Sequence, residues 1–322
     1  MHILIFAPDL AVAEKINACL AAIGNLRADG RPILGLDAKE LTKIVLNVSE
    51  QCLVVPAHLM TPWFSLFGSK SGFDSLEECF EEYSKYIFAG ETGLSADPAM
   101  LWRLEDGQRL SLISCSDAHS AAKLGREACV FDTEFSYSAI MEAMKSKDPK
   151  KFLFTIEFFP EEGKYHYDGH RLCGARLSPR ETKKYRGICP VCRRPLTVGV
   201  LSRIEELANQ AEGFVPENAI PYKSLVPLEE IIAAVLGKGT ATKQVARVYD
   251  GLIKKFGPEF NILLEASLEE IKKAEPFLAE ALSRVRQGEI QMEPGYDGVY
   301  GKLGIFPEAE RQDFRVRQQP LF

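Results

Sequence analysis

The sequence lacks any apolar run of about eighteen residues, the length that a membrane-spanning helix requires. Its N-terminal segment, MHILIFAPDL, continues into polar sequence without a small-residue cleavage site, unlike a secretory signal peptide. No GxxxxGK[ST] phosphate-binding loop occurs, which leaves little support for a helicase accessory. Internal repeats and low-complexity segments are also absent. We therefore expect a soluble protein in the cytoplasm with no membrane partner.

Basic charge is scarce overall but concentrated in one segment. The net charge of −6 argues against binding nucleic acid over the whole surface, because such proteins usually present a basic face. Between residues 160 and 203, however, ten basic side chains stand against four acidic ones, a local balance of +6. We call the basic members the basic island: Lys164, Arg171, Arg176, Arg180, Lys183, Lys184, Arg186, Arg193, Arg194 and Arg203.

The eight cysteines fall into two groups. Five lie singly in apolar segments, as reduced core residues do: Cys19, Cys52, Cys79, Cys115 and Cys129. The others follow a ligand spacing, His170-x2-Cys173, fifteen residues, then Cys189-Pro-Val-Cys192. Each two-residue gap lets one tight turn aim two side chains at a tetrahedral Zn²⁺, and a closed ligand set leaves no position for catalysis.

We therefore predict a structural zinc knuckle. His166 is an alternative fourth ligand, and a redox CxxC is the competing interpretation of Cys189 and Cys192. Because this small loop lacks apolar residues to make a core, metal binding would supply its folding free energy and hold the basic island rigid. We expect Arg171 and Arg193 to contact phosphates from this module.

The rest of the sequence predicts an α/β protein with three domains. Residues 1–159 alternate apolar runs with helical patterns, which favours a mainly parallel sheet or a partial (β/α) barrel, followed by a zinc-binding module at 160–199 and a helical C-terminal region at 200–322. Strands are expected at residues 2–7, 52–57, 110–114 and 152–158. Helices are expected at residues 11–22, from Asp37, from the capping box Asp74-Ser-Leu-Glu77 to Tyr86, and at 201–210, 228–236, 242–256 and 268–286. An Asp297-Gly298 turn predicts a terminal hairpin.

Histidine and aspartate directly follow two apolar runs. His58 ends Cys52-Leu-Val-Val-Pro-Ala, and Asp117-Ala-His119 ends Ser111-Leu-Ile-Ser-Cys-Ser. In an α/β barrel the carboxyl ends of the strands meet on one face, where such residues can share divalent ions. His2, before the first strand, is a third candidate. A single histidine after a strand is more often a core or surface group, but together these residues predict a site for Mg²⁺, Mn²⁺ or Zn²⁺.

These motifs resemble those of a known family. The Ser-Asp117-Ala-His119 ending and the strand-terminal His58 are similar to late metal-binding motifs of the polymerase and histidinol phosphatase (PHP) superfamily. More specifically, three stretches resemble the endonuclease Q family: Pro56-Ala-His58-Leu-Met-Thr-Pro-Trp63-Phe-Ser-Leu-Phe-Gly68, Glu91-Thr-Gly-Leu-Ser-Ala-Asp97-Pro, and Tyr165-His-Tyr-Asp-Gly-His170. The resemblance extends from His2 to about Phe306.

The resemblance implies a metal-dependent phosphodiesterase, an endodeoxyribonuclease that cuts DNA 5′ of deaminated bases such as uracil and hypoxanthine. It implies His2, His58, Asp117 and His119 as metal ligands, with Asp117 and His119 at the catalytic centre. Members carry an early Asp/His-x-His motif before the position that His2 matches. We therefore expect this chain to lack the N-terminal part.

An enzyme that reads lesions must extrude its target base, which requires apolar or aromatic partners. Trp63, Phe64 and Phe67 follow His58 in a Gly- and Ser-rich loop and are candidates, although aromatics near an α/β domain more often pack in its core. Glu91 is a further candidate for substrate binding at the same face. The terminal Gln318-Gln-Pro-Leu-Phe322 is similar to peptides that dock on sliding clamps, with chance or tail packing as the alternative.

Two other functions compete with a DNA endonuclease. A small-molecule phosphoesterase of the PHP type would use the same metal ligands, but it has no evident need for a basic island beside a structural zinc. A non-catalytic DNA-binding remnant would bind without cleaving, with a metal in the knuckle alone. The knuckle and its charge favour DNA as the partner.

Overall fold

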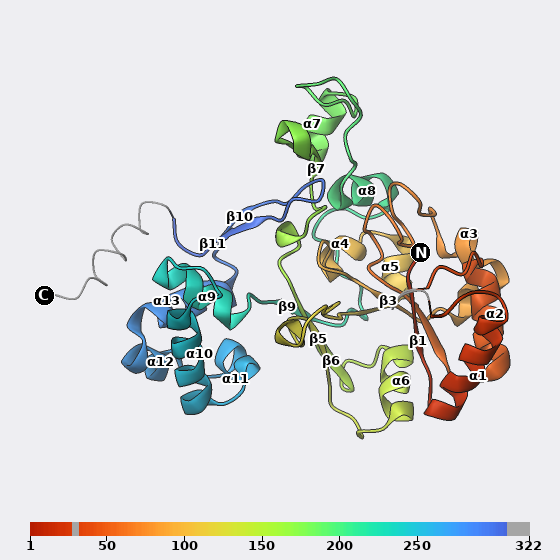
Figure 1. The fold of residues 1–322 in the computed structure, drawn as a ribbon, viewed down its shortest axis with the longest axis horizontal. Helices are drawn as coiled ribbons and strands as arrows, with labels where there is room; N and C mark the ends of the chain where they lie inside the picture. The colour runs from red at the N-terminus through yellow and green to blue at the C-terminus, as the bar shows by residue number, and fades with distance from the viewer. Residues whose placement is uncertain (28–31, 308–322) are drawn as a thin grey trace, which may run out of the picture.

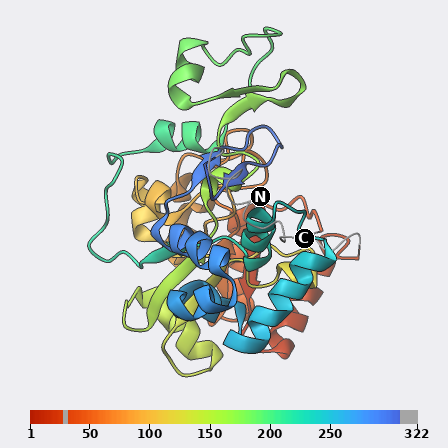
Figure 2. The same cartoon turned by 90° about the vertical axis from the view of Figure 1, so that its left-hand side faces the viewer.

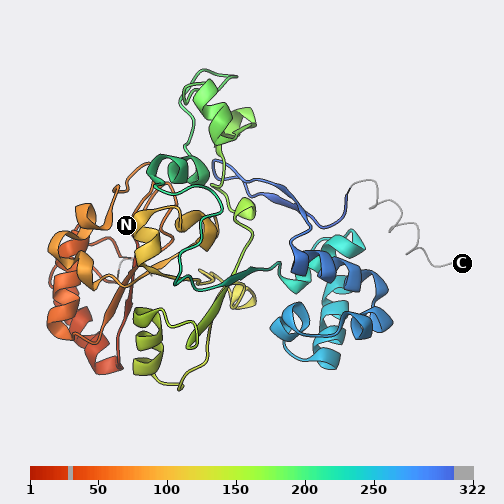
Figure 3. The same cartoon turned by 180° about the vertical axis from the view of Figure 1, so that it is seen from behind.

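The computed structural model describes residues 1–27 and 32–307, which fold into a larger α/β part, a helical part and a small projecting module (Figures 1 and 3). The clamp-like peptide Gln318–Phe322 lies outside the described residues. Within the described ranges, no helix is long and apolar enough to cross a membrane. We name the parts as follows: the α/β body (described residues of 1–165 and 197–226), the knuckle module (166–196), the helical bundle (227–289) and the hairpin (290–304).

The strands of the α/β body pair in both directions. β1 is antiparallel to β2, β3 is parallel to β4, and β6 lies between antiparallel β5 and parallel β9. The strands are β1 Ile3–Phe6, β2 Leu53–Pro56, β3 Ala89–Glu91, β4 Ser111–Ile113, β5 Ala128–Phe131, β6 Phe152–Glu157 and β9 Tyr222–Ser224. The expectation of a mainly parallel sheet was therefore wrong. Two helices instead of one connect β1 to β2, so the chain returns in the opposite direction.

Helices pack around the strands of the α/β body, with α1, α2 and α3 along its right edge in Figure 1. They are α1 Leu10–Ala21, α2 Ala38–Val48, α3 Leu76–Phe80, α4 Pro98–Leu101, α5 Glu105–Arg109, α6 Tyr137–Ser146 and α8 Val200–Leu207. The predicted capping box was displaced by one residue, because Ser75 caps α3 by accepting from the Glu78 N–H. A 3₁₀ turn, Glu81–Tyr86, replaces the expected second half of that helix.

Two apolar clusters fill the α/β body. The larger one joins α1, α2 and α3 to the segment after β2, and the smaller one packs β2, β3, β4 and β6 against α6. Helix α8 falls within the predicted C-terminal region, yet it buries Val200 and Ile204 in the larger cluster. The division of the chain at residues 159 and 199 stays a prediction.

The helical bundle has its own core. Its helices are α9 Leu228–Leu236, α10 Lys243–Phe256, α11 Glu259–Leu264, α12 Leu268–Ala274 and α13 Pro276–Gln287. The single helix expected at 268–286 is two helices, since Pro276 cannot continue the helix before it and instead opens α13. Ile156 of β6 belongs to the bundle's apolar cluster, so the sheet β5–β6–β9 lies at the junction of body and bundle (Figure 1).

The hairpin connects the bundle to the base of the knuckle module (Figure 2). It consists of β10 Gln291–Glu293 and β11 Lys302–Gly304, and Asp297 and Gly298 turn the chain with positive φ angles of 41° and 84°. Main-chain hydrogen bonds bind its tip to the α/β body: Gly295 N–H to Glu161 O, Gly298 N–H to Lys164 O and Gly301 N–H to Glu162 O.

Phe67 is a core residue, which corrects its prediction as a substrate contact. Its side chain is 1% exposed in the larger cluster of the α/β body, so it cannot reach a nucleic acid without unfolding its surroundings. Its N–H donates to Leu59 O at 2.8 Å, and its carbonyl accepts from Arg203 Nε at 3.0 Å. The apolar packing described above outweighs the Gly- and Ser-rich character of the neighbouring sequence.

Replacing Phe67 by Ala should lower the free energy of unfolding by about 3–5 kcal/mol, because it removes a buried aromatic ring and leaves a cavity. Phe64, three residues earlier and 55% exposed, provides the matched control, and its replacement by Ala should cost less than about 1.5 kcal/mol. Urea unfolding followed by circular dichroism measures both. Equal losses for the two variants would contradict the assignment of Phe67 to the core.

Candidate metal centre

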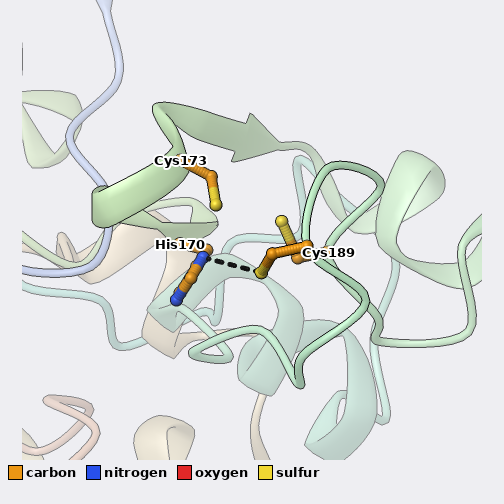
Figure 4. A group of neighbouring side chains, drawn as sticks. His170, Cys173 and Cys189 are labelled. Carbon is orange, nitrogen blue, oxygen red and sulfur yellow. Dashed lines mark hydrogen bonds between the residues drawn. The ribbon is translucent and has the colours of Figure 1, made fainter.

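Four predicted ligands meet in the knuckle module. His170 ends β7 (Asp168–His170), Cys173 lies in the turn before β8 (Ala175–Leu177), and Cys189 and Cys192 follow α7 (Pro179–Lys184). One ligand atom from each lies within 4.8 Å of all the others, and no other such group occurs among residues 1–27 and 32–307. Figure 4 shows His170, Cys173 and Cys189 pointing toward a common centre. Three sulfurs and one imidazole suit a soft or borderline metal ion, so the cluster can hold one.

The turn around Cys189 prepares its sulfur for a metal. Arg193, with a φ of 64°, donates its N–H to Cys189 O at 3.0 Å and closes the turn. The N–H groups of Cys192 and Val191 donate to the Cys189 sulfur, which lowers the pKa of that thiol to about 7. Since the thiolate is the form that binds metal, these donors favour binding at neutral pH.

The structure distinguishes between the two candidate histidines. His166 is buried, stacks on Tyr167 and places its Nδ1 3.4 Å from Ser95 O, whereas His170 Nδ1 lies 3.3 Å from Cys192 Sγ. The module also has a small apolar core, which the sequence did not suggest. It comprises Ala175, Leu177, Cys189 and Leu196.

Most of the basic island is exposed on the knuckle module. Arg171 and Arg193, the two predicted phosphate contacts, are both exposed. Arg203 is not part of this surface, because it is buried and pairs with Asp74 and Glu206 at 2.5 and 2.8 Å. The exposed members are Arg171, Arg176, Arg180, Lys183, Lys184, Arg186, Arg193 and Arg194.

A second constellation lies at the end of β2. His2 Nδ1 is 2.9 Å from His58 Nε2, and the two rings meet edge to face. The other ring nitrogen of His58, Nδ1, is 2.9 Å from the Thr61 hydroxyl, which in turn donates to Trp63 O at 3.0 Å. The Thr61 hydroxyl has one proton, which it donates to Trp63 O, so it must accept a hydrogen bond from His58 Nδ1. This network therefore assigns the proton of His58 to Nδ1. The Nε2 lone pair then faces His2.

Glu91 lies next to this pair, and its burial argues against the prediction that it contacts the substrate. It ends β3, is 2% exposed, and accepts the N–H groups of His58 and Gly93. Burial raises its pKa to about 7 although the His58 N–H opposes this, and the negative charge of Asp117 adds to the increase. Glu91 is therefore too deep to touch DNA from the surface, and its carboxylate supports the histidine pair.

Asp117 and His119 lie apart from the histidine pair, in the loop between β4 and β5. Their side chains are 57% and 69% exposed, and His119 Nδ1 is 2.8 Å from Asp117 O. The charge of Asp117 nevertheless contributes to the raised pKa of buried Glu91, so this loop lies near the same end of the strands as Glu91. The structure thus pairs His2 with His58, bonds Glu91 to the His58 main chain, and leaves Asp117 and His119 in an exposed loop.

Sequence reasoning missed two buried carboxylates. Glu157, at the end of β6, accepts from the hydroxyls of Thr155 and Thr92 at 2.6 and 2.8 Å, yet burial raises its pKa to about 7. Burial, together with the charge of Glu157, also raises the pKa of Glu127, whose Oε2 has no hydrogen-bond partner. The signal available in the sequence was Glu157, an acidic residue inside the apolar strand 152–158. Burying a charge there costs free energy unless a partner compensates it, so an acidic residue at this position indicates a function.

Two aromatic side chains border the histidine pair. Phe64 stacks on His2 with ring centroids 5.4 Å apart, and Trp63 meets Tyr165 edge to face at 5.6 Å. Phe64, His58 and Asp117 all have positive φ angles, of 60°, 33° and 41°. Non-glycine residues in this region are strained, and such strain concentrates at functional sites.

The sequence of the chain is similar to a known family and to two known proteins. A family model described as "MJ0043 C-terminal domain" matches residues 227–289. The uncharacterized protein MJ0043 of Methanocaldococcus jannaschii is 35% identical over 258 residues, and uncharacterized protein YqxK of Bacillus subtilis is 31% identical over 314. These alignments cover 77% and 94% of this chain. The chain spans 31% of the first relative's length and 73% of the second's.

Two solved structures match 96% of the chain at 30% identity. One is the lesion-specific endonuclease PfuEndoQ from Pyrococcus furiosus, with a TM-score of 0.86 over 76% of that chain. The other is endonuclease Q in complex with a 27-mer duplex substrate with an abasic lesion at the active site, with a TM-score of 0.85 over 77% of that chain. The similarity thus includes the α/β body, the knuckle module and the helical bundle.

Replacing Cys189 by Ala should remove one equivalent of bound metal, because three remaining ligands cannot close a tetrahedral site. Amide hydrogen exchange in residues 170–196 should accelerate, while exchange in the helical bundle stays unchanged. Elemental analysis and exchange mass spectrometry measure these effects. Cys19, an exposed cysteine on α1, supplies the control substitution. Full metal retention by the Cys189 variant would refute the ligand set.

Stability should depend on pH through Glu157. Its pKa is about 7 in the fold against a usual value of 4.5, so the folded state retains a proton that the unfolded state releases. Without added divalent ions, the stability that this proton contributes is therefore lost as pH rises from about 4.5 to about 7, by about 3 kcal/mol. Glu157→Gln should reduce the loss in urea unfolding curves by this share, while Glu91 and Glu162, whose pKa values are also raised, still contribute. The exposed Glu50→Gln variant should retain it, and an unchanged profile for Glu157→Gln would reject the assignment.

Proposed function

The chain belongs to the endonuclease Q family, and on this premise we propose that it is a metal-dependent endonuclease of DNA repair that cuts 5′ of deaminated bases. One observation carries the proposal: the His2–His58 pair, with Glu91 bound to the His58 main chain, lies at strand ends in a chain that matches a lesion-specific endonuclease over 96% of its length. The duplex with an abasic lesion in the second matching structure supports damaged DNA as the partner.

The residues at the strand ends are suited to holding divalent ions. We assign His2, His58, Asp117 and His119 as ligands, with Asp117 and His119 completing the catalytic centre from the rim loop. Bound Mg²⁺, Mn²⁺ or Zn²⁺ would supply a water of lowered pKa and neutralise charge on the scissile phosphate. The unpartnered Oε2 of Glu127 and the raised pKa of Glu157 fit a region that a cation would stabilise.

The chain's own groups orient this centre. The Thr61 hydroxyl accepts the Nδ1 proton of His58, so the ring's lone pair lies on Nε2, beside His2 Nδ1, as in metal-binding histidines with an outer hydrogen-bond partner. Glu91 fixes the main chain of His58, and Gly93 packs so closely that a Cβ there would lie 2.7 Å from His58 Cβ. The position of the imidazole is therefore set before any ligand arrives.

We assign DNA binding to two surfaces. In the first, Arg171 and Arg193 contact phosphates from a knuckle module that a structural Zn²⁺ holds rigid. In the second, Trp63 and Phe64 take the base that is extruded from the duplex, which costs a few kcal/mol of unstacking. The tail Gln318–Phe322 is proposed to dock on a sliding clamp.

The similarity to endonuclease Q also supports a PHP-type barrel as the origin of the α/β body. We propose a metal-hydrolase domain at residues 1–159, a zinc-binding module at 160–199 and a helical C-terminal region at 200–322. Helix α8 then serves as the element that returns the chain from the module to the core of the first domain.

The deciding experiment incubates the chain with Mg²⁺ or Mn²⁺ and end-labelled duplex DNA that contains one uracil, one hypoxanthine or one abasic site. Incision on the 5′ side of the lesion is expected, with undamaged duplex left intact. His58→Ala and His119→Ala should each lower the rate by at least roughly 10- to 100-fold, since each removes a metal ligand. Denaturing gels of the labelled strand measure the rates.

Other outcomes of the same experiment identify the competing functions. Tight, salt-sensitive binding without cleavage would reject the nuclease and indicate a DNA-binding remnant. Rapid hydrolysis of a phosphomonoester without retention of DNA would instead indicate a small-molecule phosphoesterase. Incision that survives both histidine substitutions would refute the assigned ligands.

A further inference from the structure

The loop that carries Asp117 and His119 is attached to the helical bundle at its far end. Lys123, four residues after His119, places its Nζ 2.7 Å from Glu229 Oε1 and 3.5 Å from Glu230 Oε1. Both glutamates lie in the first turn of α9. The three side chains are only about one-third exposed, so solvent screens this bridge less than a fully exposed pair.

Two further contacts extend this attachment. Gly125, with a φ of 76°, turns the chain toward α11, where the Phe260 ring lies 3.9 Å from the position that a Cβ of Gly125 would occupy. Arg126 donates its Nε–H to Ser116 O at 2.8 Å, directly beside Asp117. The chain between Ser116 and Arg126 is thus closed on itself at one end and fixed to the bundle at Lys123.

Lys123 also separates negative charges that would otherwise repel one another. Burial raises the pKa of Glu230, and the neighbouring charge of Glu229 adds to the effect while Lys123 opposes it. Glu162 of the α/β body faces the same place, where burial and the charge of Glu230 raise its pKa to about 8. Its Oε1 has no hydrogen-bond partner. Loss of the Lys123 cation would therefore loosen the contact between loop, body and bundle.

We propose that the helical bundle positions the Asp117–His119 loop through Lys123, which makes Lys123 a positioning residue for the catalytic centre. The proposal rests on the function assigned above to Asp117 and His119. It gives the bundle a role in the catalytic centre: it limits the orientations of the loop that carries Asp117 and His119.

Lys123→Met tests the proposal, because it retains the apolar stem and removes the charge. Hydrogen exchange of residues 115–124 should accelerate by about three- to tenfold, the change expected when a half-buried ion pair is lost. The kcat for incision should fall by a similar factor with little change in KM, since the DNA-binding surfaces are untouched. Lys123→Arg should restore both values.

Lys39 provides a matched control. It also bridges two glutamates, with its Nζ 2.8 Å from Glu81 and 3.6 Å from Glu82, but it lies on α2, away from the loop. Lys39→Met should leave exchange of residues 115–124 and kcat unchanged.

The two readouts distinguish this proposal from the proposed function. If the unmodified chain cuts no DNA, the nuclease assignment fails, but faster exchange in Lys123→Met alone would still establish the coupling. Unchanged exchange in Lys123→Met, or an equal acceleration in Lys39→Met, would overturn it. Exchange mass spectrometry of the full chain, without DNA, is therefore the first measurement.

Discussion

The free-energy cost of burying three carboxylates at the strand ends determines how the candidate site at those ends is built. Glu91, Glu127 and Glu157 are removed from water within reach of one another's charge. An ionised group in such a place is unstable unless hydrogen bonds, a proton or a cation compensates it. Hydroxyls and main-chain N–H groups compensate part of this cost, and the raised pKa values show that part remains.

The histidine pair depends on this buried layer. The His58 main chain donates a hydrogen bond to Glu91, and its imidazole bonds to Thr61. Gly93 packs directly against His58, which is possible only because it has no side chain. The left-handed backbone conformation of His58 persists because these contacts overdetermine it. A position defined in this way requires no large rearrangement when a ligand binds, which is the usual condition for an effective metal centre.

Local patterns determined how much could be predicted from sequence. The knuckle ligands were predictable because His170, Cys173, Cys189 and Cys192 carry their geometry in their spacing. The direction of β2 was not, because it depends on how α1 and α2 return the chain. The burial of Glu91, named as a candidate for substrate binding, was not predictable, because its depth arises from strands distant in sequence. Phe67 shows the converse error, since a polar local sequence concealed a residue that tertiary packing buries.

The hairpin has a consequence for the order in which the protein assembles. Its main-chain bonds join residues 161–164 to residues 295–301, so the footing of the knuckle module includes some of the last described residues of the chain. On a ribosome, the four metal ligands emerge more than a hundred residues before Gly295 does. The module can thus close around its ion early, whereas its attachment to the hairpin waits for a long-range loop closure, the slow kind of step in folding. Until that closure, the module is held only by its contacts with the α/β body, among them Asp168 with Gly199 and Ser202.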